Sequence, residues 1–418
     1  MDGDQALGGF TSEGLSQIPA ALQAVVDAGD ISGFVTLLWR KGEVAQVNTV
    51  GYRDVEAKKP MTRDTLFRIA SMTKPITSVA IMMLMEEGKL KLDDPITKWM
   101  PEFAGMHVLA SATGPVTDKA PAERDITVED LLTHRSGLAY AFASVGPIAQ
   151  AHEDVLGSPL ASPHGPDEWL ERLGTLPLSY PPGERFHYSH ATDVLGFLVA
   201  RIDGKSLGQA LHDRIFAPLG MTDTDFWVPS EKRERMAKLY KVNPDGPGLL
   251  DASFPLGDTP SAFEAGGGGL ISTADDYLKF ARMMLGKGEV DGVRLLKPET
   301  VELMTRNRLT DAQREVPFMG FPFWVGQGFG LGVSVILDPA KQAMTTGAQG
   351  AAGSFGWPGA FGTWWQADPA NDMILIYLIQ DSMPLGPEAV AQLASTGRMG
   401  GRLALPVFQK LTYDALAR

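Results

Sequence analysis

Cysteine is absent from this sequence of 418 residues. Without a thiol, the chain has no disulfide, no thiolate nucleophile and no cysteine-ligated zinc site. Long apolar runs are missing too, because the longest, from Val79 to Met85, falls far short of the roughly 18 residues of a membrane-spanning helix. Hydrophobic residues make up 44% of the chain and charged residues 21%, which is typical of a soluble globular protein.

Neither sign of charge is concentrated in a block, and acidic residues outnumber basic ones. The net charge of −13 disfavours nucleic acid and an anionic membrane surface as partners. The first residues, from Met1 to Gln5, lack the basic and apolar regions of a signal peptide. We therefore expect a cytoplasmic protein that acts on a small molecule, with its oligomeric state left open.

The stretch from Phe67 to Pro75 contains a serine and a lysine three residues apart, Ser71 and Lys74. Proline is tolerated in the first turn of a helix, so Pro75 predicts that a helix begins within a residue or two of Ser71. Residues three apart share a helix face, so the hydroxyl and the amine can meet. The next segment, Ile76 to Met85, is apolar on nearly every side and predicts a buried helix. Burial disfavours a charged amine and the helix N-terminus favours developing negative charge, as a serine nucleophile needs. By itself, however, the S-x-x-K pattern also occurs by chance.

Periodicity and turn residues divide the chain into two parts. The predicted helices span 13–28 with Ser12 as N-cap, a short segment after the capping box 127–130, then 167–173, 191–202, 206–215 and a closing stretch after Pro406. The predicted strands span 34–39, 44–50, 331–337, 362–366 and 373–380. We therefore predict an α+β fold, with an α/β lobe made of residues 1–96 and 229–418 and an inserted all-helical lobe over residues 97–228.

Two further segments can bring chemistry to the serine. Tyr188 lies on a loop that follows two prolines and precedes a predicted helix, which suits a phenol presented to a cleft, although a packed aromatic is the simpler interpretation. A nearby ammonium favours a phenolate, so either Tyr188 or Lys74 could take the serine proton. The glycine-rich stretch 353–361 enters a strand, where the backbone can approach a ligand closely. One N–H from it, with that of Ser71, would hold an oxyanion.

Taken together, these motifs resemble the serine β-lactamase and penicillin-binding-protein superfamily, and within it the family VIII carboxylesterases and the related statin-pathway acyltransferases. The matching segments are 64–74, 131–138, 188–190, 266–276 and 357–360. The resemblance implies that Ser71 is the nucleophile, Lys74 its general base and Tyr188 a partner in proton transfer, with the backbone N–H groups of Ser71 and Ala360 as the oxyanion hole. It also implies a β-lactamase-like fold, an antiparallel sheet flanked by helices, with the cleft beside the helical lobe.

Two positions depart from the usual pattern of β-lactamases and indicate substrate-binding residues. Trp357, followed two residues later by Gly359, replaces the lysine of a Lys-Thr-Gly motif, as in family VIII esterases. Losing that cation removes a charge-assisted contact of about 1.5–3 kcal/mol with a substrate carboxylate, which favours a neutral substrate. His190 stands where asparagine is common and could orient a group near Tyr188.

Other motifs have simpler interpretations. The segment 352–356 imitates a nucleophile elbow, but a strand rather than a helix is predicted after its serine. His152-Glu153 begins like a zinc motif, but Leu156 stands where its second histidine should be, and we expect no metal and no organic cofactor. The glycines at 266–269 fit tight turns and close backbone approach. The remaining aromatic residues of interest could line an acyl pocket or belong to an ordinary core; they are Phe318, Phe321, Phe323 and Trp324.

The sequence therefore predicts a serine carboxylesterase that hydrolyses small, short-chain esters through an acyl-enzyme. Three alternatives share the same nucleophile. They are a β-lactamase or D-Ala carboxypeptidase, an acyltransferase, and a penicillin-binding module that acylates without turnover.

Overall fold

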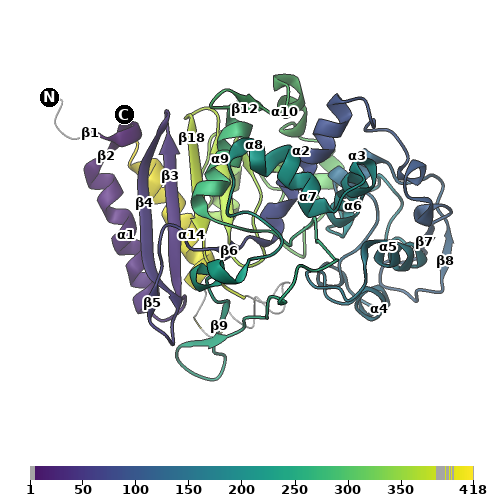
Figure 1. Ribbon diagram of the computed structural model, residues 1–418, viewed down its shortest axis with the longest axis horizontal. Helices are drawn as coiled ribbons and strands as arrows, with labels where there is room; N and C mark the ends of the chain where they lie inside the picture. Colours follow the sequence, from purple (N-terminus) through teal and green to yellow (C-terminus); the bar gives the residue numbers. More distant parts are fainter. Residues whose placement is uncertain (1–4, 383–390, 392–394, 396, 398–399, 418) are drawn as a thin grey trace.

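An eight-stranded antiparallel sheet forms the centre of the computed structural model, which describes residues 5–382, 391, 395, 397 and 400–417. In spatial order its strands are β14 (Gln327–Phe329), β15 (Ser334–Ile336), β16 (Phe355–Gly356), β17 (Trp364–Asp368), β18 (Met373–Leu378), β3 (Gly33–Arg40), β4 (Glu43–Asp54) and β5 (Lys59–Pro60). Strand β18 pairs with β3, so the two ends of the chain build one sheet (Figure 1).

The remaining elements are helices and short strand pairs. In the described part of the chain, the α-helices of four or more residues are α1 (Ser12–Asp27), α2 (Thr73–Glu86), α3 (Val128–Leu132), α4 (Pro147–Leu156), α5 (Pro166–Thr175), α6 (Ala191–Asp203), α7 (Leu207–Leu211), α9 (Ala274–Leu285), α10 (Pro298–Met304), α11 (Asp311–Arg314), α12 (Pro339–Thr346) and α14 (Gly400–Asp414). The short strand pairs are β1 (Gln5–Ala6) with β2 (Phe10–Thr11), β6 (Phe67–Arg68) with β11 (Ile271–Ser272), β7 (His107–Leu109) with β8 (Lys119–Pro121), β9 (Tyr240–Val242) with β10 (Leu249–Asp251), and β12 (Glu289–Val290) with β13 (Val293–Arg294).

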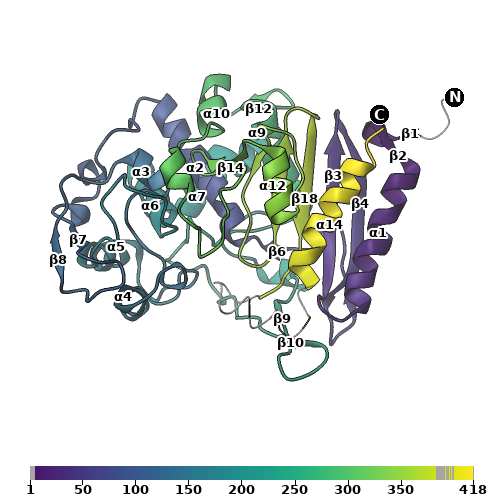
Figure 2. The same ribbon diagram turned by 180° about the vertical axis from the view of Figure 1, so that it is seen from behind.

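Alternate side chains of the central strands enter different cores, because successive residues of a strand point to opposite faces. Phe34 and Tyr377 pack in the core that includes residues of α1 and α14, and Figure 2 shows these two helices beside each other against the sheet. Leu37 and Ile376 belong instead to a larger core that includes residues of α2 and α9. Both faces of the sheet are therefore covered by helices.

The predicted α+β class and the main elements are confirmed. The hairpin appears as β3 and β4, the apolar run 373–380 appears as the fully buried strand β18, and Thr127 forms the predicted capping box with Asp130. Helix α2 begins at Thr73, two residues after Ser71, and it is buried along most of its length. The sequence signals that worked were alternating or continuous apolar runs, a proline in a first turn and a capping box.

Three details were predicted incorrectly. Helix α14 begins at Gly400 and contains Pro406, so the closing helix starts before the proline and not after it. The N-cap of helix α1 is Thr11, whose Oγ1 accepts a hydrogen bond from Gly14 N, rather than Ser12. The lobe over 97–228 is not all-helical, because β7 and β8 form a small antiparallel pair. Packing of an apolar helix face outweighs a proline, and three-residue strands are too short to show a period.

The helices α3 to α7 gather at one end of the molecule, opposite α1 (Figure 1). Their core is continuous with that of the sheet: Trp169 and Val194 fall in the same cluster of buried side chains as Leu37. The lobe boundaries at 97 and 228 remain predictions. Among the residues that the structure describes, no helix is both long and apolar enough to span a bilayer.

Candidate active site

A short, strained connection presents Ser71. Strand β6 pairs with β11, and the chain then turns through a single 3-10 turn, Ala70–Met72, into α2. Ala70 has a φ of 45°, in the left-handed region that costs a non-glycine residue on the order of 1–3 kcal/mol. Backbone strain of this kind is commonly stored where a side chain must be held in one direction. Ser71 is held at the N-terminal end of the buried helix as a result.

The three polar groups predicted to converge do so. Lys74 Nζ donates a hydrogen bond to Ser71 Oγ at 3.1 Å, and the hydroxyl of Tyr188 donates to the same oxygen at 2.6 Å. The ammonium also lies 4.6 Å from the centre of the Tyr188 ring. Ser71 is only partly buried, whereas Lys74 is 1% and Tyr188 6% exposed. The serine oxygen is therefore the accessible member of a largely buried cluster.

Lys74 is fixed by two further acceptors that the sequence did not indicate. Its Nζ donates to the carbonyl of Gly267 at 2.6 Å and to the hydroxyl of Tyr140 at 3.2 Å. A carbonyl oxygen can only accept, and the Tyr140 hydroxyl gives its own hydrogen to Asp193 Oδ2 at 3.3 Å. Two of the three Nζ positions are thus committed, and the third faces the nucleophile.

Asp193 completes this arrangement from the first turn of α6. It is fully buried, and its carboxylate accepts hydrogen bonds from Gly267 N at 2.8 Å and Tyr140, and contacts Nδ1 of His190 at 2.8 Å. Burial raises the pKa of Tyr140 well above its usual value, and the negative charge of Asp193 adds to that effect. Tyr140 therefore remains a neutral phenol between an ammonium and a carboxylate.

A side chain at Gly267 would displace two groups of this network. A Cβ at that position would lie 2.7 Å from the Tyr140 hydroxyl and 2.9 Å from Asp193 Oδ1. The prediction that the glycines at 266–269 allow close backbone approach is confirmed, and the approach brings a carbonyl to Lys74.

The structure places Trp357 directly against Tyr188 and buries it. Its indole N–H donates to the Tyr188 hydroxyl at 3.1 Å, and its side chain is 1% exposed. Aromatic residues whose role the sequence left open pack around the same phenol. The ring centre of Phe318 lies 5.4 Å from that of Tyr188, and Trp324 is buried behind Phe186. Phe321, by contrast, is 38% exposed. The proposed lining of an acyl pocket is thus an aromatic shell around Tyr188.

The turn that carries Gly359 and Ala360 packs on the residues just before the nucleophile. Thr363 Oγ1 donates to the carbonyl of Ile69 at 3.0 Å, and a Cβ on Gly359 would lie 2.4 Å from that same carbonyl oxygen. Glycine at 359 is therefore required for the turn to approach the backbone of Ile69 this closely. The predicted oxyanion partner, Ala360, follows directly in this turn.

His190 lies behind Tyr140 rather than beside Ser71. It is 3% exposed, its Nδ1 faces Asp193, and its ring meets that of Tyr140 edge to face at 4.4 Å. His134 is also buried, and burial lowers its pKa well below the usual value. Sequence reasoning missed Tyr140 and Asp193. A single aspartate among the apolar residues of the 191–202 helix was the available signal, but an acidic residue in a first turn is ordinarily explained by the helix dipole.

The competing motifs do not form sites. Ser354, in the elbow-like segment, is fully buried and is followed by strand β16 instead of a helix. Within the described ranges, no group of three or more histidine, aspartate and glutamate side chains is arranged to hold a metal ion.

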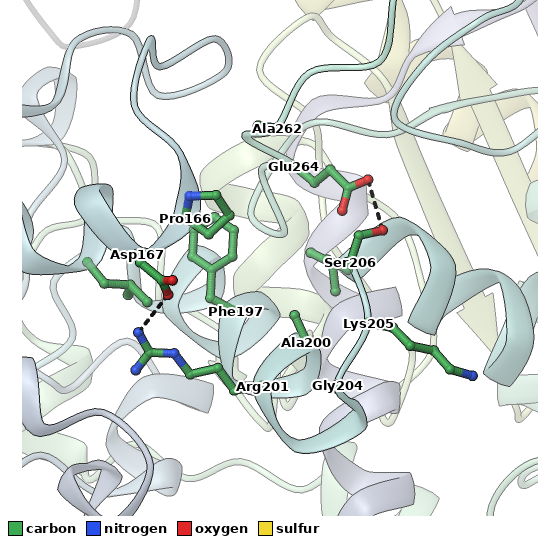
Figure 3. Close-up of a pocket in the computed structure, with 12 residues that line it drawn as sticks. Pro166, Asp167, Phe197, Ala200, Arg201, Gly204, Lys205, Ser206, Ala262 and Glu264 are labelled. Atoms are coloured by element: carbon green, nitrogen blue, oxygen red, sulfur yellow. Dashed lines mark hydrogen bonds and ion pairs between the residues drawn. The ribbon is translucent and has the colours of Figure 1, made fainter.

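Two cavities lie in the helical half of the molecule. One, of about 360 Å³, is lined by α5, α6 and the start of α7, and its polar groups pair with each other: Asp167 with Arg201, and Glu264 with Ser206 (Figure 3). The other, of about 480 Å³, is lined by Phe142, His152 and His190, among others, and adjoins the ring of Tyr140. Only the second cavity therefore lies against the serine cluster.

The antiparallel sheet between helices and the serine at the head of a buried helix together define a β-lactamase-like protein. A family model described as Beta-lactamase matches residues 18–395, and the chain belongs to this family. It is 51% identical over 398 residues to Protein Rv1367c of Mycobacterium tuberculosis, covering 95% of this chain and 98% of that protein.

Relatives with a described activity include hydrolases of esters. The chain is 32% identical over 387 residues to Esterase EstB of Burkholderia gladioli, covering 87% of this chain and 90% of the esterase. Among solved structures it is similar to EstCE1, described as a hydrolase with promiscuous acyltransferase activity, with a TM-score of 0.75, 27% identity and coverage of 94% and 99%. The resemblance inferred from the motifs is confirmed, and the chain belongs to a family of hydrolases and acyltransferases.

Proposed function

We propose that this protein is a serine carboxylesterase that hydrolyses small, short-chain esters through an acyl-enzyme on Ser71. The observation that carries the proposal is the convergence of Lys74 Nζ and the Tyr188 hydroxyl on one serine oxygen, at 3.1 and 2.6 Å. Two groups able to exchange a proton with the nucleophile, one on each side, are what acyl transfer by serine requires.

The reaction then has two halves. For Lys74 or Tyr188 to take the proton of Ser71, that group must first be unprotonated, as a neutral amine or a phenolate. It accepts the proton as the serine oxygen attacks the ester carbonyl, and the proton then passes to the departing alcohol. Water attacks the acyl-enzyme with the same groups acting in reverse, and the acid leaves. The backbone N–H groups of Ser71 and Ala360 hold the oxyanion in both halves, a role supported by the close packing of the 359–363 turn on Ile69.

The identity of residue 357 supports a neutral ester over a β-lactam or a peptide terminus. Trp357 supplies an N–H to Tyr188 where those enzymes have a lysine for a substrate carboxylate. An indole can stabilise charge on the phenol oxygen but cannot replace the ion pair with a carboxylate. Gly359 contributes by leaving room for the backbone turn.

The test is the substitution Ser71→Ala, assayed with p-nitrophenyl butyrate beside nitrocefin. We expect loss of at least about a thousandfold in ester kcat/KM, because removing the nucleophile leaves only binding and oxyanion contacts. A fluorophosphonate probe should label wild-type protein at Ser71, as read by peptide mass spectrometry.

The matched control is Ser354→Ala, which alters the serine of the elbow-like segment. Its Oγ is buried and has no hydrogen-bond partner among the described residues, so ester hydrolysis should continue at the wild-type rate. Full activity in Ser71→Ala, or loss of activity in Ser354→Ala with the fold intact, would refute the assignment.

Acyl transfer to an alcohol is the second candidate function. Its support is the similarity to EstCE1, whose description includes promiscuous acyltransferase activity. An added alcohol should then divert the acyl group from water, and the ratio of new ester to free acid measures the partition.

A further inference from the structure

The cavity of about 480 Å³ behind Tyr140 contains an unusual polar group. His152 lines it from α4 and is 2% exposed, yet neither ring nitrogen has a hydrogen-bond partner among the residues that the structure describes. Its ring is parallel to that of His190, 5.9 Å away, which lines the same cavity. Buried polar groups are nearly always hydrogen bonded, so two unpaired nitrogens on a cavity wall indicate a missing partner.

The cavity is adjacent to the groups that surround the nucleophile. Phe142, which lines it, stacks on Tyr140 at 4.7 Å and meets the Tyr188 ring at 6.3 Å. The lining segment 157–159 continues into Leu160, and a Cβ on Gly268 would lie 2.9 Å from Leu160 and 3.8 Å from the backbone of Ala70. The cavity therefore borders the groups that surround Ser71 and Lys74, a position that suits one limb of a substrate bound at the serine.

The lining also defines the chemistry of that limb. It contains the carboxylate of Glu153 and no lysine or arginine, so an anionic group would find no counter-charge. Burial lowers the pKa of His152 to about 3, which leaves a neutral imidazole with one donor and one acceptor nitrogen. The Nδ1 of His190 is taken by Asp193, so only its Nε2 is left for a ligand. A hydroxyl both donates and accepts, so it can pair with either nitrogen in either tautomer.

We propose that this cavity binds a neutral, hydroxyl-bearing limb of the ester substrate, with His152 as the residue that recognises the hydroxyl. The inference rests on the proposed esterase function and adds a substrate class to it. The hydroxyl could lie on the acyl chain or on the leaving alcohol, and the experiment separates these two sources.

The experiment compares kcat/KM within two pairs of esters that differ by a hydroxyl in place of a methyl. The acyl pair is p-nitrophenyl 3-hydroxybutyrate and p-nitrophenyl 3-methylbutyrate, and the alcohol pair is 2-hydroxyethyl butyrate and propyl butyrate. Wild-type protein should prefer the hydroxyl ester about tenfold in one pair, the effect of one well-made hydrogen bond. His152→Phe should reduce that ratio to about one, and His152→Gln, which keeps a donor and an acceptor, should restore part of it.

The control is His212→Phe, because His212 is 60% exposed and lies outside the cavity lining; it should keep the wild-type ratio. Equal rates within both pairs in wild-type protein would mean that water fills the cavity, and would overturn the inference without any variant. An unchanged preference in folded His152→Phe would overturn it as well. If wild-type protein hydrolyses none of the four esters, the proposed function itself fails, an outcome distinct from hydrolysis without a hydroxyl preference.

Discussion

Two buried polar groups on opposite sides of Tyr140 are treated differently by this fold. Lys74 has all three donor positions occupied, by Ser71, Tyr140 and the carbonyl of Gly267. His152 has no hydrogen-bond partner for either ring nitrogen within the described part of the chain. The two side chains are almost equally buried, at 1% and 2% exposed, so burial alone does not explain the difference.

The contrast separates a group that must be held in place from a group that awaits a ligand. Each fixed acceptor around Lys74 removes freedom from the amine and directs its remaining position at the serine, which is preorganisation for proton transfer. An unpaired buried polar atom costs about 1–3 kcal/mol, and that cost is recovered when a ligand supplies the bond. Substitutions around Lys74 should therefore change the rate of the chemical step, whereas substitution of His152 should change which substrate is preferred.

The largest effect should come from Lys74→Met, which keeps the length of the side chain and removes the amine. We expect ester kcat/KM to fall by about 10³, within the range for loss of a positioned acid or base. The folded state should also lose stability, because the Gly267 carbonyl and the Tyr140 hydroxyl lose their donor. Stopped-flow acylation with p-nitrophenyl butyrate measures the first effect, and urea unfolding measures the second.

The comparison variant is Lys341→Met, because the side chain of Lys341 is 69% exposed and pairs with Asp338 at the surface. It should match wild-type protein in both measurements. An acylation rate in Lys74→Met within threefold of wild type would show that Lys74 is not needed for proton transfer.

A smaller loss is expected from Asp193→Asn, about 10- to 100-fold in kcat with KM little changed. The carboxylate contacts Tyr140, His190 and Gly267 but not the serine, so it acts by positioning and by charge. An amide keeps the shape but replaces one acceptor oxygen with a donor, which disrupts at least one of these contacts. Steady-state kinetics with p-nitrophenyl butyrate separates the kcat effect from KM.

Asp276→Asn provides a matched control, because Asp276 is also buried and accepts from the backbone N–H of Asp223. It should reduce the free energy of unfolding without reducing kcat. An equal fall of kcat in both variants would indicate a general loss of structure instead of a role for Asp193 at the lysine.

The sequence predicted well those parts of the molecule that depend on neighbours along the chain. The three-residue spacing of Ser71 and Lys74, the proline after them and the apolar helix beyond are local features, and their geometry followed. Tyr188 was identified through the order of motifs that the family shares. Chain spacing and physical distance agree for Ser71 and Lys74 but not for Tyr188, which contacts Ser71 from 117 residues away.

The rest depends on contacts between distant segments. The acceptors of Lys74 come from residues 140 and 267, and the relevant feature of Gly267 is a backbone carbonyl, which no residue type reveals. In the sequence, His152 stands out only as half of a zinc motif. That its ring nitrogens lack a partner can be seen only when all possible partners are placed in space. The strand pair β7 and β8 in the helical lobe was missed for the same reason, since tertiary contacts determine that these two segments pair.

The smallest effect concerns acid stability and compares two imidazoles whose pKa is lowered with an exposed one. Burial lowers the pKa of His152 to about 3 and that of His187 to about 4, whereas the unfolded chain takes up these protons near pH 6.5. Stability should therefore be complete above about pH 6.5 and decline as the pH falls towards 4, because the unfolded state gains the protons first. Each histidine should contribute about 2 kcal/mol to the loss between pH 7 and pH 5.

In urea unfolding at these two pH values, His152→Phe should lose about 2 kcal/mol less of its free energy of unfolding than wild-type protein does, whereas His212→Phe should lose as much as wild type. Parallel pH dependences for wild type and His152→Phe would mean that His152 is protonated in the folded protein. The contrast between a fixed, charged group at Lys74 and an unpaired, neutral group at His152 would then be wrong.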